Sequence, residues 1–203
     1  ARRVLQINAG VATIDGLIFR NGMRSADAYA TGCGIRRVGT GTLHMARCAI
    51  ADNRPSGQNY AYGVGAYFEK GTVHLEDCAI VDNEAKTGVW GKGIGIYAKQ
   101  VTLVLNNCVL TNNARRASGN CMDGGALFIE GGGVYATNCL FAYNKPTASH
   151  DHHWGDGSGA ALAVGANGEF RNCLFHHNTV YIGSTAYNFG GTIKLAPDAG
   201  AIL

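Results

Sequence analysis

The sequence predicts an all-β solenoid, a parallel β-helix of about six coils with three short strands in each coil. Cysteine residues recur at spacings of 30 to 34 residues, and a similar string follows each of them, as in CAIADN and CAIVDN. Apolar residues alternate with a period of two, which is typical of strands with one buried face. No segment has a helical period. The recurring cysteines are Cys48, Cys78, Cys108, Cys139 and Cys173.

The first strand of each coil follows a recurrent glycine, as in GVGAYF from Gly63 and GIGIYA from Gly93. Its alternate apolar residues are expected to face the core, and Arg37 is the one misfit in these inward positions. The positions between them are expected to face outward. The first outward position holds Gly34, Gly65, Gly95, Ala126, Ala161 and Thr192, and the next holds Arg36, Tyr67, Tyr97, Phe128, Ala163 and Lys194.

A second strand precedes each cysteine, with Val73 and Leu75 facing inward in one coil, and a third begins at the cysteine and buries residues such as Ile80. A leucine-rich repeat is the main rival, because its asparagines are also periodic. Its units of about 20–29 residues are shorter and richer in leucine, so the β-helix is preferred.

An asparagine closes each repeat and is expected to lie at a turn with a left-handed backbone, where its amide donates and accepts along the coil axis. GLIFRN, from Gly16 to Asn21, is interpreted as a sixth copy with glycine in the cysteine place. The cysteines are interpreted as small buried hydrophobes, because stacked side chains that point the same way oppose disulfide geometry. The asparagines are Asn21, Asn53, Asn83, Asn113, Asn144 and Asn178.

Composition excludes several classes of protein. A hydrophobic content of 46% excludes a disordered chain, and the net charge of +3 is too mild to indicate nucleic-acid binding. No apolar run approaches the length of a membrane-spanning helix. Residues 1–203 are predicted to form one β-helix domain. We see no capping element at either end, so we expect a segment of a longer solenoid or ends that pack on partners in an assembly.

The string GGALFIEGGGVYATNCLFAYN, from Gly124 to Asn144, resembles the glycine-rich repeats of bacterial polymorphic outer-membrane proteins and adhesin-like right-handed parallel β-helix proteins. The FxxN form of that group is present at Phe141 to Asn144 and at Phe175 to Asn178, and the resemblance runs from about Val4 to Leu195. It implies a right-handed coil of the pectate-lyase-like superfamily and a place outside the cell or on the outer surface of a bacterium. Polysaccharide lyases, epimerases, tailspikes and adhesins share this architecture, so the resemblance is specific for the fold and not for function.

Aromatic side chains suggest a binding surface. Tyr67, Tyr97 and Phe128 are expected to form an exposed ridge on one sheet face, which would stack on sugar rings or anchor a protein partner. A cross-strand ladder that only stabilises the sheet is the alternative. Trp90 and Trp154 lie in variable loops on one edge, together with Tyr29, Tyr60, Tyr62 and several cations, which suits an acidic glycan or a protein surface.

Two groups of residues are weak candidates for chemistry. The loop from Lys145 to Ser158 holds imidazoles and carboxylates that would suit a transition-metal ion or an acid–base pair, although a plain polar loop is the simpler alternative. Asp52 and Asp82 occupy equivalent places in adjacent coils, as a carboxylate pair or as turn-capping residues. No CxxC motif is present and no cofactor is predicted. The loop residues are His150, Asp151, His152, His153 and Asp156.

The sequence thus favours an adhesin-like structural or interaction module that presents loops and an aromatic sheet face to a protein or glycan partner. The alternative is a polysaccharide lyase or epimerase that acts on acidic glycans through His152 in the long loop or through the Asp52/Asp82 pair. No complete catalytic constellation is found in the sequence.

Overall fold

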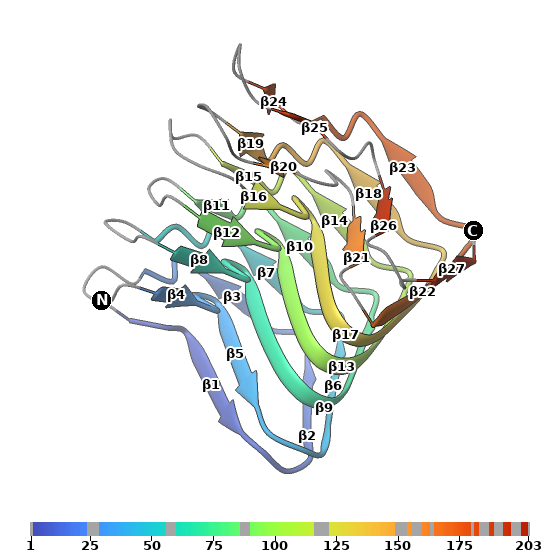
Figure 1. The fold of residues 1–203 in the computed structure, drawn as a ribbon. Helices are drawn as coiled ribbons and strands as arrows, with labels where there is room; N and C mark the ends of the chain where they lie inside the picture. Colours follow the sequence, from blue (N-terminus) through green and yellow to red (C-terminus); the bar gives the residue numbers. More distant parts are fainter. Residues whose placement is uncertain are drawn as a thin grey trace.

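A computed structural model gives the fold of the chain (Figure 1). The structure describes residues 2–23, 29–55, 60–85, 90–115, 122–148, 154–155, 160–162, 165–179, 181–182, 187–188, 193–195 and 200–202. All regular elements within these residues are β-strands, and all pairs of named strands are parallel, so the predicted parallel β-helix is confirmed.

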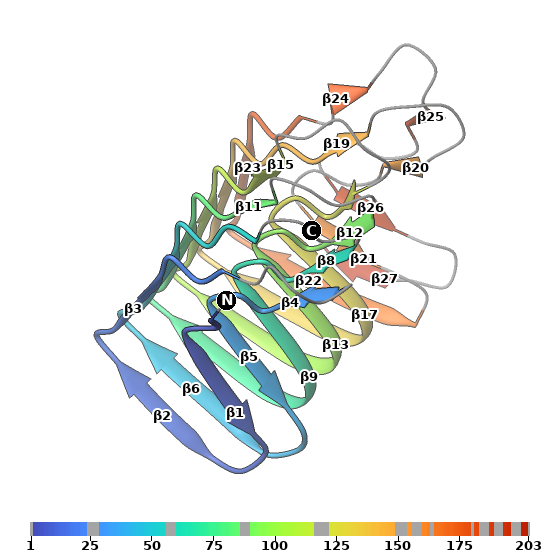
Figure 2. The same ribbon diagram turned by 90° about the vertical axis from the view of Figure 1, so that its left-hand side faces the viewer.

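The largest sheet covers two faces of the solenoid. On one face its order is β1-β5-β9-β13-β17-β21-β26, and on the next face β2, β6, β22 and β27 complete it. The three central strands bend around the corner and serve both faces, so the predicted first and second strands are continuous there (Figures 1 and 2). The strands are β1 (Leu5–Asn8), β2 (Ala12–Asp15), β5 (Ile35–Val38), β6 (Thr42–Ala46), β9 (Ala66–Glu76), β13 (Ile96–Asn106), β17 (Leu127–Thr137), β21 (Ala160–Leu162), β22 (Ala166–Arg171), β26 (Ile193–Leu195) and β27 (Gly200–Ile202).

A second sheet, in the order β23-β18-β14-β10-β7-β3, holds the strands that follow the cysteines. Neighbouring strands pair in register, as in Ala49 with Ala79 and Ala79 with Val109, so each inward residue stacks on its equivalent one coil away. The strands are β3 (Ile18–Arg20), β7 (Ala49–Ala51), β10 (Ala79–Val81), β14 (Val109–Thr111), β18 (Leu140–Ala142) and β23 (Leu174–His176).

The return segments also contain strands, which the sequence pattern did not predict. The main one of these sheets has the order β16-β12-β8-β4 and borders the large sheet (Figure 2). The solenoid has about four turns, slightly fewer than the six predicted: six described strands stack in the cysteine-side sheet, but four stack in this one. The strands are β4 (Tyr29–Thr31), β8 (Tyr60–Tyr62), β12 (Trp90–Lys92), β16 (Met122–Asp123), and the pairs β11 (Glu84–Ala85) with β15 (Ala114–Arg115), β19 (Thr147–Ala148) with β24 (Tyr181–Ile182) and β20 (Trp154–Gly155) with β25 (Tyr187–Asn188).

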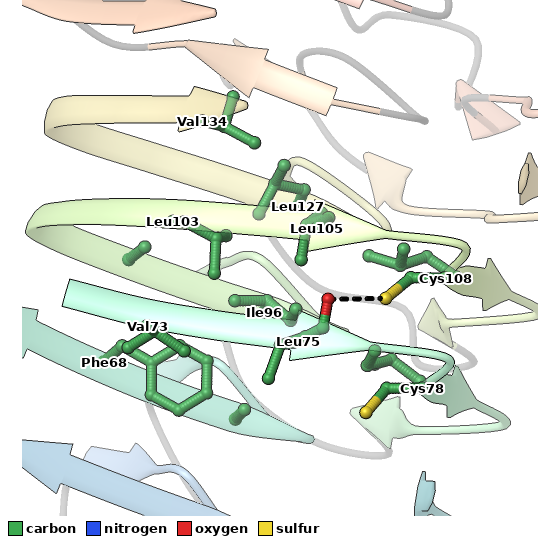
Figure 3. Close-up of a cluster of buried hydrophobic side chains, with 14 of the residues drawn as sticks. Phe68, Val73, Leu75, Cys78, Ile96, Leu103, Leu105, Cys108, Leu127 and Val134 are labelled. Carbon is green, nitrogen blue, oxygen red and sulfur yellow. Dashed lines mark hydrogen bonds between the residues drawn. The ribbon is translucent and has the colours of Figure 1, made fainter. Parts of the chain in front are cut away.

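The inward faces of the sheets form one hydrophobic core, in which Leu75, Leu103 and Leu105 are fully buried (Figure 3). The cysteines pack in this core as predicted, and the six in the described part of the chain are free thiols. Each recurring thiol donates to carbonyl groups; the Cys108 Sγ, for example, lies 3.4 Å from the Leu75 carbonyl oxygen of the preceding coil (Figure 3). Burial raises the pKa of the Cys78 thiol, which fits a packing role.

The asparagines form a hydrogen-bonded ladder inside the solenoid. The Asn83 Nδ2 donates to Asn113 Oδ1 over 3.0 Å, and the Asn113 Nδ2 donates to Asn144 Oδ1 over 3.0 Å. Each of these amides also donates to a backbone carbonyl group, and the ladder runs from Asn53 to Asn178. The left-handed backbone conformation was expected at the asparagines themselves, which is wrong. The positive φ angles belong to the residue just before each position of the ladder. These residues are Asn21, Asp52, Asp82, Asn112, Tyr143 and His177.

The first repeat is displaced by one residue from the predicted alignment. Ile18 pairs with Ala49, so Leu17 takes the cysteine place and Gly22 takes the asparagine place. The Gly22 backbone N–H donates to Asn53 Oδ1 over 2.8 Å and ends the ladder there. Asn21 is therefore outside the ladder. The displaced register places the large Phe19 in the core.

The glycines expected to face outward are buried instead. A Cβ atom at Gly65 would lie 2.6 Å from the Gly95 carbonyl oxygen and 2.9 Å from the Asn83 Nδ2. The backbone passes so close to the asparagine ladder that a side chain at Gly65 would displace one of these groups. The recurrent glycines at this strand position, Gly34, Gly65 and Gly95, therefore make room for the asparagine ladder.

Candidate functional site

The outward aromatic residues of the large sheet form the candidate site. Tyr67, Tyr97 and Phe128 stack along the axis, with ring centroids 5.2 Å apart for the first pair and 5.8 Å for the second. They point away from the core, but the prediction of an exposed ridge is wrong, because their exposed fractions are only 9%, 5% and 5%. This buried stack forms a small second core with Val38 and Tyr62. Whether these three residues bind a partner stays a prediction.

A second aromatic column lies beside the first and is more exposed. Tyr29 and Tyr60 stack with centroids 4.7 Å apart and an interplanar angle of 14°. Tyr62 links the two columns, because its ring lies 5.5 Å from the ring of Tyr97 and 6.2 Å from that of Tyr29. Tyr29 is 51% exposed and lies on the first strand of its sheet. The surface formed by Tyr29, Tyr60 and Tyr62 is called the tyrosine face below.

The backbone register continues past the tyrosine face. Trp90 in β12 pairs with Tyr60, so this predicted binding residue occupies the next position along the sheet. Its side chain lies outside the described residues. Trp154, the other tryptophan predicted to bind, pairs with Tyr187 in β20, and its side chain is likewise outside the described part. The structure thus aligns Trp90 with the tyrosines and assigns Trp154 to a different sheet.

Polar groups fix the buried stack from the outer side. The Tyr97 hydroxyl donates to Glu130 Oε2 over 2.6 Å, and the Tyr67 hydroxyl donates to Glu69 Oε2 over 3.0 Å. Burial and these carboxylates raise the pKa of both tyrosines above its ordinary value. Burial of Glu130 opposes its ionisation, but the hydrogen bond from Tyr97 and the charges of Lys99 and Lys92 outweigh burial and lower the pKa of Glu130.

Cations and carboxylates are balanced around this stack. Lys92 Nζ lies 3.5 Å from Glu130 Oε2 and 4.7 Å from the ring centroid of Phe128. Lys99 Nζ lies 3.2 Å from Glu130 Oε1, and the Arg36 guanidinium lies 5.5 Å from the ring centroid of Tyr67. The surroundings of the stack therefore favour an uncharged or mixed ligand surface over a polyanion. Glu69, Lys99 and Glu130 were not singled out from the sequence, although each follows an aromatic residue of the stack by two positions. Lys92 was not singled out either, and it follows Trp90 by two positions.

The Asp52 and Asp82 carboxylates are each engaged by other groups. Asp52 forms ion pairs with Arg20 and Arg54, at 3.2 Å in both cases. Asp82 accepts a hydrogen bond from the Asn112 amide. A pocket of about 20 Å³ lies beside Asp82, which is close to the volume that one water molecule needs. Both residues have positive φ angles at the turn, which agrees with the turn-capping alternative.

The long loop is not part of the described chain. His150, Asp151, His152, His153 and Asp156 lie outside the described residues, so its metal-binding and acid–base roles stay predictions. Among the residues that the structure does describe, no group of three or more His, Cys, Asp or Glu side chains is placed to hold a metal ion. The same residues include no helix with the length and apolar character needed to cross a membrane.

Comparison with known proteins agrees with the observed fold. The family described as the right-handed beta helix region matches residues 4–188, which is most of the chain. No curated protein and no solved structure matched the chain significantly. The handedness expected from the sequence is the one that defines this family. The chain belongs to the right-handed β-helix family.

Proposed function

We propose that this β-helix is an adhesin-like recognition module, secreted or displayed on a bacterial surface, that binds a glycan at its tyrosine face. One observation carries the proposal: Tyr29 is half exposed at the end of an ordered aromatic stack, in which Tyr60 covers one side of its ring. A preorganised aromatic ring loses little conformational entropy when a ligand packs on it.

The geometry also indicates which part of the surface would bind. The rings of Tyr67, Tyr97 and Phe128 cover one another and are nearly inaccessible, so they support the site rather than contact a ligand. Tyr29 is 51% exposed, and a ring with a hydroxyl suits the mixture of apolar C–H and hydroxyl groups on a sugar. Because Lys92 and Lys99 beside the buried stack are paired with Glu130, binding is expected to depend little on salt.

A glycan array tests this assignment. We expect the native protein to bind a subset of neutral or mixed glycans and Tyr29→Ala to lose about tenfold or more in affinity, because the exposed ring contributes a contact worth about 1.5 kcal/mol. Tyr135→Ala is the matched control, since Tyr135 is 45% exposed on β17, outside the aromatic columns. An array without binding, or equal losses in both variants, contradicts the glycan assignment and leaves a protein partner as the interpretation to pursue.

A further inference from the structure

Two histidines stack on a different face of the solenoid. His44 on β6 and His74 on β9 pair directly in the register, and their rings lie 4.6 Å apart with an interplanar angle of 7°. His44 is exposed and His74 is partly exposed, on the outer side of strands whose inward residues are core residues such as Leu43 and Val73. The backbone beneath the two imidazoles is therefore rigid while the rings remain accessible to solvent.

The surroundings of His74 disfavour its charged form. Burial and the neighbouring His44 lower the pKa of His74, because two imidazolium ions at this separation repel each other. Thr13 and Val104 flank the pair along its row, and Thr42 pairs with Thr72 two residues earlier on the same face.

Few charged residues lie close to His44 and His74 on the same face of their strands. Glu76 lies two residues beyond His74 on β9, and Asp15 lies two residues beyond Thr13 on β2, where it pairs with Arg47.

We propose that His44 and His74 form a two-histidine chelating site for a divalent transition-metal ion of the kind that imidazole prefers, such as Cu²⁺ or Zn²⁺. Two nitrogens that bind one such ion at about 2.0–2.1 Å lie about 3 Å apart. In the stacked arrangement the nitrogen lone pairs lie in the two parallel ring planes, so each ring must turn about its Cβ–Cγ bond to direct one nitrogen at a shared ion. The broad torsional preference of a histidine ring permits this turn. Water completes the coordination.

Site-resolved NMR with Cu²⁺ alone as the probe tests the proposal. We expect Cu²⁺ to broaden the backbone amide signals of β6 and β9 around the histidines at low metal concentration. His74→Gln and His44→Gln are each expected to raise the required concentration about a hundredfold, because a single imidazole loses the chelate effect. The broadening is also expected to disappear below about pH 6, where protons compete for the nitrogens. Any metal bound at another histidine would broaden the signals around that histidine, so the two sites are told apart by position.

Two further variants sharpen the outcome. Val104→His extends the row to three imidazoles and is expected to tighten binding, whereas His176→Gln, which removes an exposed histidine on β23, is expected to leave the β6 and β9 signals unchanged. Broadening at β6 and β9 that persists in His74→Gln, or that is absent up to millimolar Cu²⁺, overturns the proposal. The substituted side chains lie on the outer face, so unchanged circular dichroism is the expected sign that each variant folds.

Discussion

Asn113→Ala is expected to lower the free energy of unfolding by about 3 kcal/mol or more. The Asn113 Nδ2 donates to the Ile80 carbonyl oxygen and to Asn144 Oδ1, while its Oδ1 accepts from the Asn83 amide and backbone N–H. Asn83, Asn144 and Ile80 are all fully buried. An alanine at position 113 therefore leaves several polar groups without hydrogen-bond partners and without water. Each such group costs about 1–3 kcal/mol. Thermal unfolding followed by circular dichroism measures the loss.

The control for this ladder variant lies on the same coil. Asn106 is exposed on the outer side of β13, so Asn106→Ala is expected to change stability by no more than about 0.5 kcal/mol. If Asn113→Ala unfolds the chain altogether, Asn178→Ala, at the partly buried end of the ladder, provides a milder measurement of the same effect. Equal melting temperatures for Asn113→Ala and Asn106→Ala would show that the ladder does not stabilise the coils.

Arg37→Leu is expected to stabilise the protein by about 2 kcal/mol, which corresponds to a rise in melting temperature of about 4–8 °C. Arg37 is fully buried at an inward position of β5, where its neighbours in the register are Ile7 and Phe68. Its guanidinium donates to the Lys70 carbonyl oxygen, but Nε and Nη2 have no hydrogen-bond partner. Burial lowers the pKa of the guanidinium, which reflects the cost of holding this charge away from water.

The adjacent arginine provides a matched control for Arg37→Leu. Arg36 faces outward over Tyr67, so Arg36→Leu removes a charge of the same kind without relieving a buried one. We expect no gain in melting temperature for that variant. A lower melting temperature for Arg37→Leu than for the native protein would mean that the guanidinium has a compensating partner and that its burial is not a net cost.

The sequence predicted the fold because every coil repeats the same pattern of burial. The inward residues of all three strands were assigned correctly in the central coils, where Val73, Leu75 and Ile80 are buried. The first repeat was misaligned by one residue because GLIFRN matches the later copies as a string, whereas the structure aligns Phe19 with Ile50. A match between sequence strings takes no account of the volume of a core side chain. Here the alignment of the first repeat places the large Phe19 in the core.

The candidate site was only partly predictable. Alternation correctly placed Tyr67, Tyr97 and Phe128 away from the core, but it could not show that Tyr62 from a return segment packs beside them. The short strands that align Tyr29 with Tyr60 follow segments of variable length. The pairing of these strands therefore cannot be predicted from a fixed spacing in the sequence. The stacked histidines were visible as TLHM and TVHL, 30 residues apart, but only pairing in the structure brings their rings together.

Proton NMR of uronate polymers after incubation with the protein tests most directly whether this β-helix is a recognition module or an enzyme. One spectrum detects both the unsaturated ends that a lyase makes and the altered uronate composition that an epimerase leaves. A recognition module leaves the spectrum identical to that of a blank without protein, and this is the result we expect. Turnover above the blank that is lost in Asp52→Ala or His152→Ala would contradict the proposed function.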